Sequence, residues 1–280
     1  MNPETETLIN QWYVGNPIPA ASSLTPSDPF AARAFLSSGA LDKIKGMQHS
    51  EFVALRAVAL MAVFLNAPAN RPTAIAKLAD LASSSSDPTA MYLHACAEMH
   101  ACKDQDELLN RSALSLIDTY LASTTTRESA EELLALKAIH SVAVHDAESA
   151  NSAATALARI DETAACRFAQ AVVALSEGRA MDAWLGFEDL SNEFGSSASL
   201  AAGRIAASLA RGLDISDEAT AEARDEVGAA NAATACFRAG KLDEADLWLK
   251  RLGQSHAFSI AARDIEIACS EFGRDSSQFC

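Results

Sequence analysis

The chain has 280 residues, 49% of them hydrophobic and 6% aromatic, and its 37 acidic residues outnumber 22 basic ones to give a net charge of −15. This length allows one long domain or two small ones. The acidic balance and the lack of a useful Lys/Arg cluster exclude a nucleic-acid backbone or an anionic membrane surface as partner, because both attract basic side chains.

Alanine is the most informative residue in the composition, because 59 residues of the chain are alanine. Alanine is the best helix former, and its small side chain lets helices approach closely. Residues that favour strands are sparse, and 12 glycines and 8 prolines give few signals for tight β-turns. We therefore predict an all-α fold.

Residues 1–27 are predicted to be a lead-in segment. Glu4 and Glu6 stand where a signal peptide would carry basic residues, so none is expected. The longest apolar run, 57–65, is too short to span a bilayer. Asp28–Pro29 places a capping side chain before a proline, which is typical of a helix N-terminus and begins the predicted helical region.

Two further signals mark helix ends in the first half of the chain. Ser83–Ser86 is a four-serine run before Asp87–Pro88, and we interpret it as a turn between two helices, with Asp87 as the N-cap of the second. Thr125–Glu128 reads as a capping box at the start of another helix.

The segment from His94 to Cys102 has the residue types of a metal site, since His94, Cys96, His100 and Cys102 fall within nine residues. Only Cys96 and His100 share a helix face, however, and four tetrahedral ligands cannot converge from one helix. We expect no metal and no other cofactor. The six cysteines have no framework spacing, so we expect reduced thiols of a cytosolic protein; they are Cys96, Cys102, Cys166, Cys236, Cys269 and Cys280.

No nucleophile, phosphate loop or zinc-protease signature is found in the sequence, so no catalytic residue is predicted. Adjacent carboxylates diverge by about 100° on a helix and cannot form an acid/base dyad. We expect three such pairs on solvated helix faces or turns, namely Glu131–Glu132, Asp217–Glu218 and Asp225–Glu226. Trp184, Phe187 and Trp248 are expected to pack in the core.

A repeated turn signal is the main finding. Gly178–Ala183 and Gly240–Ala245 each place glycine at a turn and alanine five residues later, as between the two helices of a tetratricopeptide unit. Weaker versions begin at Gly39, His145 and Gly212. The turns at 145, 178 and 212 are 33 and 34 residues apart, close to the 34-residue period of such repeats, whereas the turn at 240 follows after 28.

These turns predict a tetratricopeptide-like α-solenoid, a right-handed superhelix of antiparallel helix pairs in which the first helices line a concave surface. We expect a single domain over 1–280, with helical repeats over 28–273 and a tail over 274–280. Eight predicted positions point inward and form the candidate partner-binding set: Phe168, Val172, Ala202, Ala206, Leu209, Ala230, Thr234 and Phe237.

The chain resembles the epsilon subunit of coatomer, the coat of COPI vesicles. The resemblance is strongest between about residues 133 and 273 and rests on segments that look like family repeats: Ala171–Leu175, Asp182–Leu190, Ala201–Gly212, Leu249–Leu252 and Ser255–Phe258. Ala257 stands where the family usually has proline. Near the N-terminus, Trp12–Asn16 is similar to the family's opening segment.

The resemblance implies a non-catalytic component of the coat that binds the C-terminal domain of the alpha subunit of coatomer. It also implies a cytoplasmic protein that is peripheral on Golgi and COPI vesicle membranes and serves Golgi–ER transport. The alternative is a generic tetratricopeptide adaptor or co-chaperone that binds a peptide segment. A carboxylate clamp would need Lys, Arg and Asn on the inward face, and the predicted positions are instead small and apolar, which favours docking of a helix or hairpin.

Overall fold

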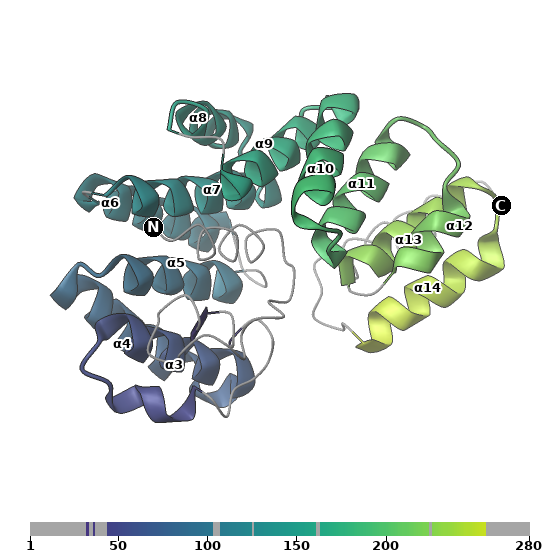
Figure 1. Ribbon diagram of the computed structural model, residues 1–280. Coiled ribbons are helices and arrows are strands. Elements are labelled where there is room, and N and C mark those ends of the chain that lie inside the picture. Colours follow the sequence, from purple (N-terminus) through teal and green to yellow (C-terminus); the bar gives the residue numbers. More distant parts are fainter. Residues whose placement is uncertain are drawn as a thin grey trace. The chain divides into compact units, whose positions relative to one another are not determined.

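The described part of the chain is helical. The computed structural model describes residues 32, 33, 36, 44–102, 107–124, 126–160, 163–223 and 226–255, and these ranges contain no strand, which confirms the all-α prediction. The predicted lead-in over 1–27, Asp28–Pro29, the predicted turn at Gly39 and the predicted tail over 274–280 lie outside them. The elements are η3 (Lys45–His49), α3 (Val53–Asn66), η4 (Pro68–Asn70), α4 (Arg71–Ser85), α5 (Pro88–Cys102), α6 (Glu107–Ser123), α7 (Arg127–Ala143), α8 (Ala147–Leu157), α9 (Ala164–Ser176), α10 (Ala180–Phe194), α11 (Ala198–Ala210), α12 (Ser216–Glu222), α13 (Glu226–Arg238) and α14 (Leu242–Ser255) (Figure 1).

The chain divides into two compact units, residues 1–176 and 177–280. In the first unit, α3 packs on α4 and α5, α5 on α6 and α7, and α7 on α8 and α9. In the second, α11 packs on α10, α12 and α13, and α13 packs on α12 and α14. Within each unit an odd-numbered helix therefore contacts both its hairpin partner and the next odd-numbered helix, which is the packing expected of stacked helix pairs.

The predicted turns inside the helix pairs are confirmed by the backbone. His145, Gly178, Gly212 and Gly240 adopt φ of 59°, 77°, 81° and 75°. The N–H groups of Asp146, Leu213 and Lys241 donate to the carbonyls of Ser141, Ser208 and Cys236 at 2.8, 3.2 and 2.9 Å. These bonds make three of the turns Schellman motifs, in which a residue with positive φ ends the helix and satisfies its last carbonyls.

Local capping explains two of the helix starts. The Asp87 carboxylate accepts from the N–H of Ala90 at 3.0 Å, as predicted for α5, and the Asp146 carboxylate accepts from Ser149 at 3.0 Å to begin α8. The hydrogen bonds from Ser149 hold the pKa of Asp146 below its ordinary value. Each bond satisfies an N–H that the helix itself leaves unpaired.

Two predicted helix boundaries are wrong by a few residues. Helix α4 continues through Ser85, because serine hydroxyls bond back to carbonyls of the preceding turn, and only Ser86, with φ of 51°, leaves the helix. The N-cap of α7 is Thr126, and its hydroxyl lies 2.6 Å from that of Ser129 without capping a backbone N–H. Thr125 and the side chain of Glu128, which the predicted capping box would join, lie outside the described residues.

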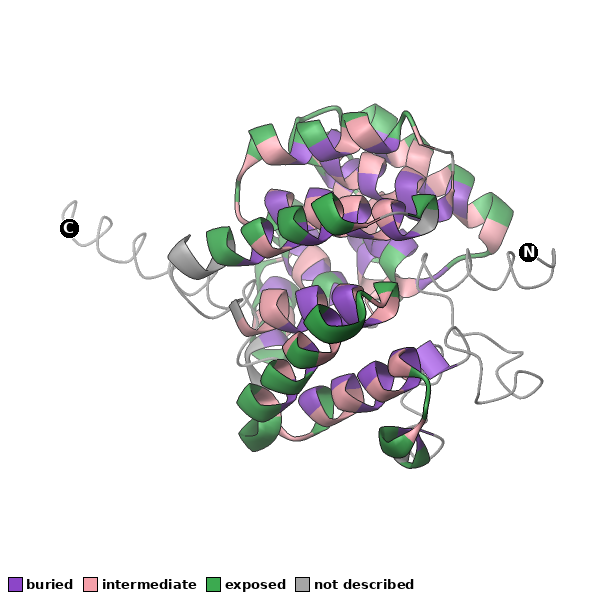
Figure 2. Ribbon diagram, turned by 90° about the vertical axis from the view of Figure 1, so that its left-hand side faces the viewer, coloured by how far each residue is buried: buried purple, intermediate pink, exposed green. Residues whose placement is uncertain are grey.

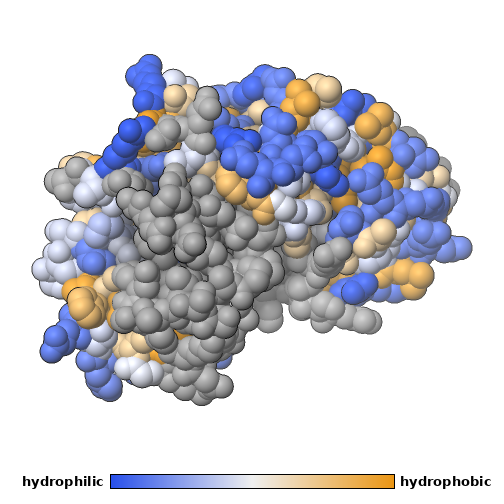
Figure 3. All heavy atoms as spheres, viewed as in Figure 1, coloured by the Kyte–Doolittle hydropathy of each residue, from blue (hydrophilic) through white to orange (hydrophobic). Residues whose placement is uncertain are grey.

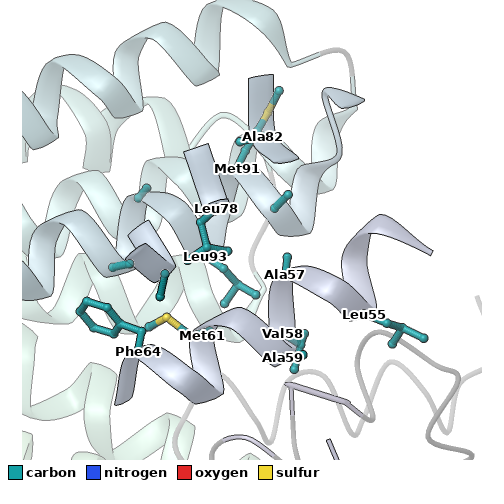
Figure 4. Packing of buried hydrophobic residues seen from close by; sticks show 14 of the residues in the cluster. Leu55, Ala57, Val58, Ala59, Met61, Phe64, Leu78, Ala82, Met91 and Leu93 are labelled. Carbon is teal, nitrogen blue, oxygen red and sulfur yellow. The ribbon is translucent and has the colours of Figure 1, made fainter. Parts of the chain in front are cut away.

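The core of the first unit combines alanine with a few large side chains. Figure 4 shows Met61 and Phe64 of α3 meeting Leu78 of α4 and Leu93 of α5, and all four are buried. Elsewhere the helices bury alanine stripes, so that buried and exposed positions alternate along each helix (Figure 2). Small side chains at the crossings let neighbouring helices approach closely.

Two carboxylates of the first unit that we expected to face solvent are largely buried. Glu131 is buried, and the carboxylate of Glu132 pairs with the guanidinium of Arg33 at 2.9 Å. The expectation of a solvated face at Glu131–Glu132 is therefore wrong, since Glu131 is buried and the Glu132 side chain pairs with a residue about 100 positions earlier in the chain. In the second unit Asp217 is exposed as expected and pairs with Lys241.

Candidate functional site

The predicted partner-binding residues lie on helices α9, α11 and α13, which belong to different units. Phe168 and Val172 are partly exposed on α9 of the first unit. The other six lie on α11 and α13 of the second unit.

The six residues of the second unit differ sharply in exposure. Ala206 and Ala230 are partly exposed, and Thr234 and Phe237 are exposed. Ala202 and Leu209 are buried, and Leu209 belongs to a small core cluster with Ile205, Ala219 and Ala235. These two positions therefore hold α11 against its neighbours, and a partner reaches them only if those helices separate.

Two side chains of α13 fasten it to α11. The Asn231 amide donates to the carbonyl oxygen of Ala202 at 2.9 Å, and the Arg238 guanidinium donates to that of Leu209. Both donors lie 29 residues after their acceptors and seven residues apart, so α11 and α13 run parallel with a fixed register. The contact buries Ala202 and Leu209, which explains why these two positions do not line a free surface.

Beside this contact, each helix carries a stripe of exposed or partly exposed residues. On α11 the stripe contains Ser199, Ala206 and Ala210, and on α13 it contains Val227 and Thr234. By helical geometry both stripes border the line of contact on the same side, so they form one surface, which we call the α11–α13 face. The sequence analysis missed Ser199, Ala210 and Val227, although they share the spacing of three, four or seven residues with the positions it found.

The α11–α13 face offers small apolar and hydroxyl groups, with Val227 as its large exposed side chain; the Thr234 hydroxyl donates to the carbonyl of Ala230 in its own helix. The cationic groups nearest to it are engaged elsewhere. Arg204 pairs with Glu188 of α10 at 2.8 Å and Glu218 of α12 at 3.7 Å, and Arg238 binds α11. On the described surface in Figure 3, apolar side chains are scattered among hydrophilic ones.

The residues of the candidate metal segment make contacts of other kinds. His94 Nδ1 lies 2.6 Å from the hydroxyl of Tyr120, and the His100 ring meets the Phe64 ring edge-to-face with centroids 5.4 Å apart. Burial raises the pKa of the Cys96 thiol to about 12, against a lowering by its hydrogen bond with Tyr92. Such a thiol stays protonated and is a poor metal ligand, because the thiolate is the form that binds metals.

Of the three aromatic residues expected in the core, Phe187 is buried and the two tryptophans are not. Phe187 is buried, as predicted, and its ring fills the space left by the missing side chain of Gly203. Trp184 and Trp248 are only partly buried, and the guanidinium groups of Arg211 and Arg251 lie over their rings at 5.7 and 4.9 Å from the centroids. The two tryptophans thus pack with their outer faces covered by cations.

Comparison with known protein families identifies the family of this chain. The family model described as "Coatomer epsilon subunit" matches residues 7–280. The chain belongs to the coatomer epsilon subunit family. The resemblance found in the sequence is thereby confirmed, and the match extends over nearly the whole chain.

The fold agrees with a solved structure. A tetratricopeptide repeat protein from Parabacteroides merdae superposes with a TM-score of 0.59 at 13% identity, over 83% of this chain and 93% of that one. This likeness confirms the tetratricopeptide-like fold of the epsilon-family chain. No protein among the curated ones matches it, and none of the described helices is long and apolar enough to cross a bilayer.

Proposed function

We propose that this chain is a non-catalytic scaffold of the COPI coat that binds the C-terminal domain of the alpha subunit of coatomer, with the α11–α13 face as part of the contact. Membership of the epsilon family carries the proposal. In this role the protein is cytoplasmic and peripheral on Golgi and vesicle membranes through the coat.

The chemistry of the α11–α13 face supports docking of an apolar helix or hairpin. Its exposed residues are alanine, serine, threonine and valine, which allow a partner backbone to approach closely. Phe168 and Val172 on α9 give the first unit a partly exposed apolar pair of its own. Neither set offers a charge that would fix an ionic group of the partner.

The alternative of an adaptor that captures a charged peptide tail has less support. A carboxylate clamp needs cations and amides that point into a free surface. In the described second unit Asn231 and Arg238 donate to backbone carbonyls of α11, and Arg204 lies between two carboxylates. Recruiting Asn231 or Arg238 for a ligand would break the contacts that hold α13 on α11, and recruiting Arg204 would break its ion pairs with α10 and α12.

The test is binding of the full chain to the purified C-terminal domain of the alpha protein, measured by calorimetry. Ala206→Glu and Thr234→Glu each place a charge on the α11–α13 face, and we expect either to weaken binding at least tenfold, because an unpaired charge would be buried in the contact. Ala221→Glu adds the same charge at an exposed position of α12 outside the face and serves as the matched control.

Two results would count against the proposal. If the wild-type chain does not bind the alpha domain, the assigned partner is wrong. If it binds and all three variants bind equally well, the contact lies on another face. A pull-down from native cytosol separates the alternatives further, since the adaptor model predicts chaperones among the captured proteins and the coat model predicts a large coat protein.

A further inference from the structure

Helix α4 ends in a run of serines that are all exposed: Ser83, Ser84, Ser85 and Ser86. The helix continues through Ser85, Ser86 turns the chain with a φ of 51°, and α5 begins at Pro88. The run belongs to the first unit, whereas the α11–α13 face belongs to the second. It therefore presents a group of hydroxyls to solvent, at the end of a helix hairpin that the proposed partner contact does not use.

Two of these hydroxyls bond back into the last turn of α4. Ser84 Oγ donates to the carbonyl oxygen of Asp80 at 2.6 Å, and Ser85 Oγ donates to that of Leu81 at 2.5 Å. Such bonds occupy the hydroxyl within its own helix. Each bond needs the hydroxyl proton, so a serine whose oxygen carries another group cannot make it. Modification of either serine would therefore change the hydrogen bonding at the end of the helix.

The charges that flank the run in the sequence are negative. Asp80 lies one helical turn before Ser84, and Asp87 follows three residues after it as the N-cap of α5, where its carboxylate accepts from the N–H of Ala90 at 3.0 Å. The nearest basic residue in the sequence is Lys77, two turns before Ser84. The carbonyl end of α4 adds partial negative charge of its own. A further anion at Ser84 would therefore be repelled by Asp80 and by the helix end.

The same charges indicate which enzyme would modify the run. A serine kinase recognises the charges beside its target, and a carboxylate three residues after the serine suits the class that selects acidic segments. Ser84 has this carboxylate in Asp87, and it lies at a helix end, which opens more readily than a helix interior. Two other exposed serines each meet one of the two conditions. Ser115 precedes Asp118 by three residues but lies in the middle of α6, and Ser123 ends α6 but has no carboxylate at that distance.

We propose that Ser84 is a phosphorylation site for a kinase that selects acidic segments, and that the phosphate unwinds the last turn of α4. In this step the Ser84 oxygen bonds to the γ-phosphorus of ATP, the bond from that phosphorus to the β-phosphate oxygen breaks, and ADP leaves. A carboxylate of the kinase takes up the hydroxyl proton. The inference goes beyond the proposed function and does not depend on it.

The phosphate acts on the helix in two ways. Phosphorylated Ser84 cannot donate to the Asp80 carbonyl, and its charge of about −2 lies at the negative end of α4. Ala82 is 1% exposed and belongs to the same core cluster as Met91 of α5, so it stays anchored (Figure 4). The unwinding is therefore confined to the residues that follow Ala82.

Treatment of the full chain with ATP and an acid-selective kinase of the casein kinase type, followed by mapping of the phosphate by mass spectrometry, tests the site. We expect phosphate on Ser84, and none in Ser84→Ala at that position. Asp87→Asn should slow the reaction about tenfold, because it removes the flanking charge while asparagine still caps α5. Ser115 and Ser123 are the internal controls and should stay unmodified.

Hydrogen exchange measured by mass spectrometry tests the effect on the helix. We expect the amides of 83–86 to exchange about fivefold faster in the phosphorylated chain than in the unmodified one, while those of α3 keep their rates. Ser84→Ala is the matched control, because it removes the hydroxyl without adding charge. Its amides should exchange no faster than those of the wild type, since alanine favours the helix.

Each outcome decides for or against the proposal. Phosphate on Ser84 together with faster exchange at the end of α4 supports both the site and its effect. No phosphate on Ser84, or equal labelling of Ser84, Ser115 and Ser123, overturns the site, and so does labelling of Ser85 or Ser86 in its place. Phosphate on Ser84 with unchanged exchange of 83–86 overturns the unwinding of the helix.

Discussion

The guanidinium of Arg33 lies 2.9 Å from the carboxylate of Glu132, and the two side chains are only 3% and 11% exposed. The same guanidinium lies 4.7 Å above the centre of the Tyr92 ring. This pair links a segment that precedes α3 to helices α5 and α7. Removing one partner deletes one half of this largely buried ion pair, whereas removing both deletes the pair as a whole.

We expect Glu132→Gln to lower the free energy of unfolding, by up to about 3–5 kcal/mol, because it removes the carboxylate charge that pairs with the Arg33 guanidinium in a largely buried position. The double variant Arg33→Met, Glu132→Leu should regain most of this loss, since apolar residues of similar size often replace a buried pair without cost. Urea denaturation followed by circular dichroism measures both. A double variant as unstable as the single one would show that the pair itself stabilises the unit.

The turn between α7 and α8 has histidine where its counterparts have glycine. Because His145 adopts φ of 59°, we expect His145→Gly to stabilise the chain by about 1 kcal/mol. Gly240→Ala should destabilise it by about 1–2 kcal/mol, since a Cβ there meets nothing within 4 Å and only the backbone is strained. Gly46→Ala, equally uncrowded but without positive φ, is the control and should cost nothing in a thermal melt.

The close approach of Gly203 to Phe187 predicts an unfavourable alanine in a helix. A Cβ at Gly203 would lie 2.8 Å from three ring carbons of Phe187, and the ring is buried and cannot swing aside. We expect Gly203→Ala to destabilise the second unit by about 1–3 kcal/mol in spite of a gain of about 1 kcal/mol in helix propensity. In a Phe187→Leu background the same substitution should cost less, and a double-mutant cycle measures the coupling. No coupling would mean that the two residues do not touch.

Two alanines at helix crossings predict the effect of overpacking. Ala183 is fully buried and Ala245 is 4% exposed, so Ala183→Trp and Ala245→Trp should each destabilise the second unit by about 1–3 kcal/mol or more. Ala221→Trp at an exposed position of α12 is the control. Circular dichroism melts compare the three, and unchanged melting temperatures for both buried variants would contradict the repeat register.

Stability should fall in alkaline solution. Burial raises the pKa of Cys96 from 9.0 to about 12, and burial with the nearby charge of Glu98 raises that of Tyr120 from 10.0 to about 12. From about pH 9 to pH 12 the folded chain therefore binds more protons than the unfolded chain, and the Cys96 thiol alone lowers stability by at most about 1.4 kcal/mol per pH unit.

The measurement is urea denaturation at several values between about pH 8 and pH 11. Cys96→Ala removes one of the titrating groups, so we expect its stability to fall less steeply with pH than that of the wild type. Equal slopes for the two proteins would show that the Cys96 thiol titrates at its ordinary value when folded.

The sequence by itself determined the features that depend on a few adjacent residues. The turns at 178, 212 and 240 could be predicted because only glycine adopts positive φ without strain, and Asp87–Pro88 could be predicted because capping needs only the first turn of a helix. The abundance of alanine and the spacing of the turns were enough to predict stacked helix pairs, and the resemblance of several segments to the coatomer epsilon subunit predicted the family.

Only the tertiary structure decided which faces of these helices are free. The adjacent residues of α7 suggest that Glu132 is a surface carboxylate, and only the fold brings Arg33 to it. Leu209 is buried because it packs on Ala219 of α12 and Ala235 of α13. Burial is a property of what packs against a residue, and in an array that partner comes from a segment some 28 or 100 residues away. A pattern within one helix fixes where its apolar side lies, but the order and reach of the other segments decide whether that side is covered.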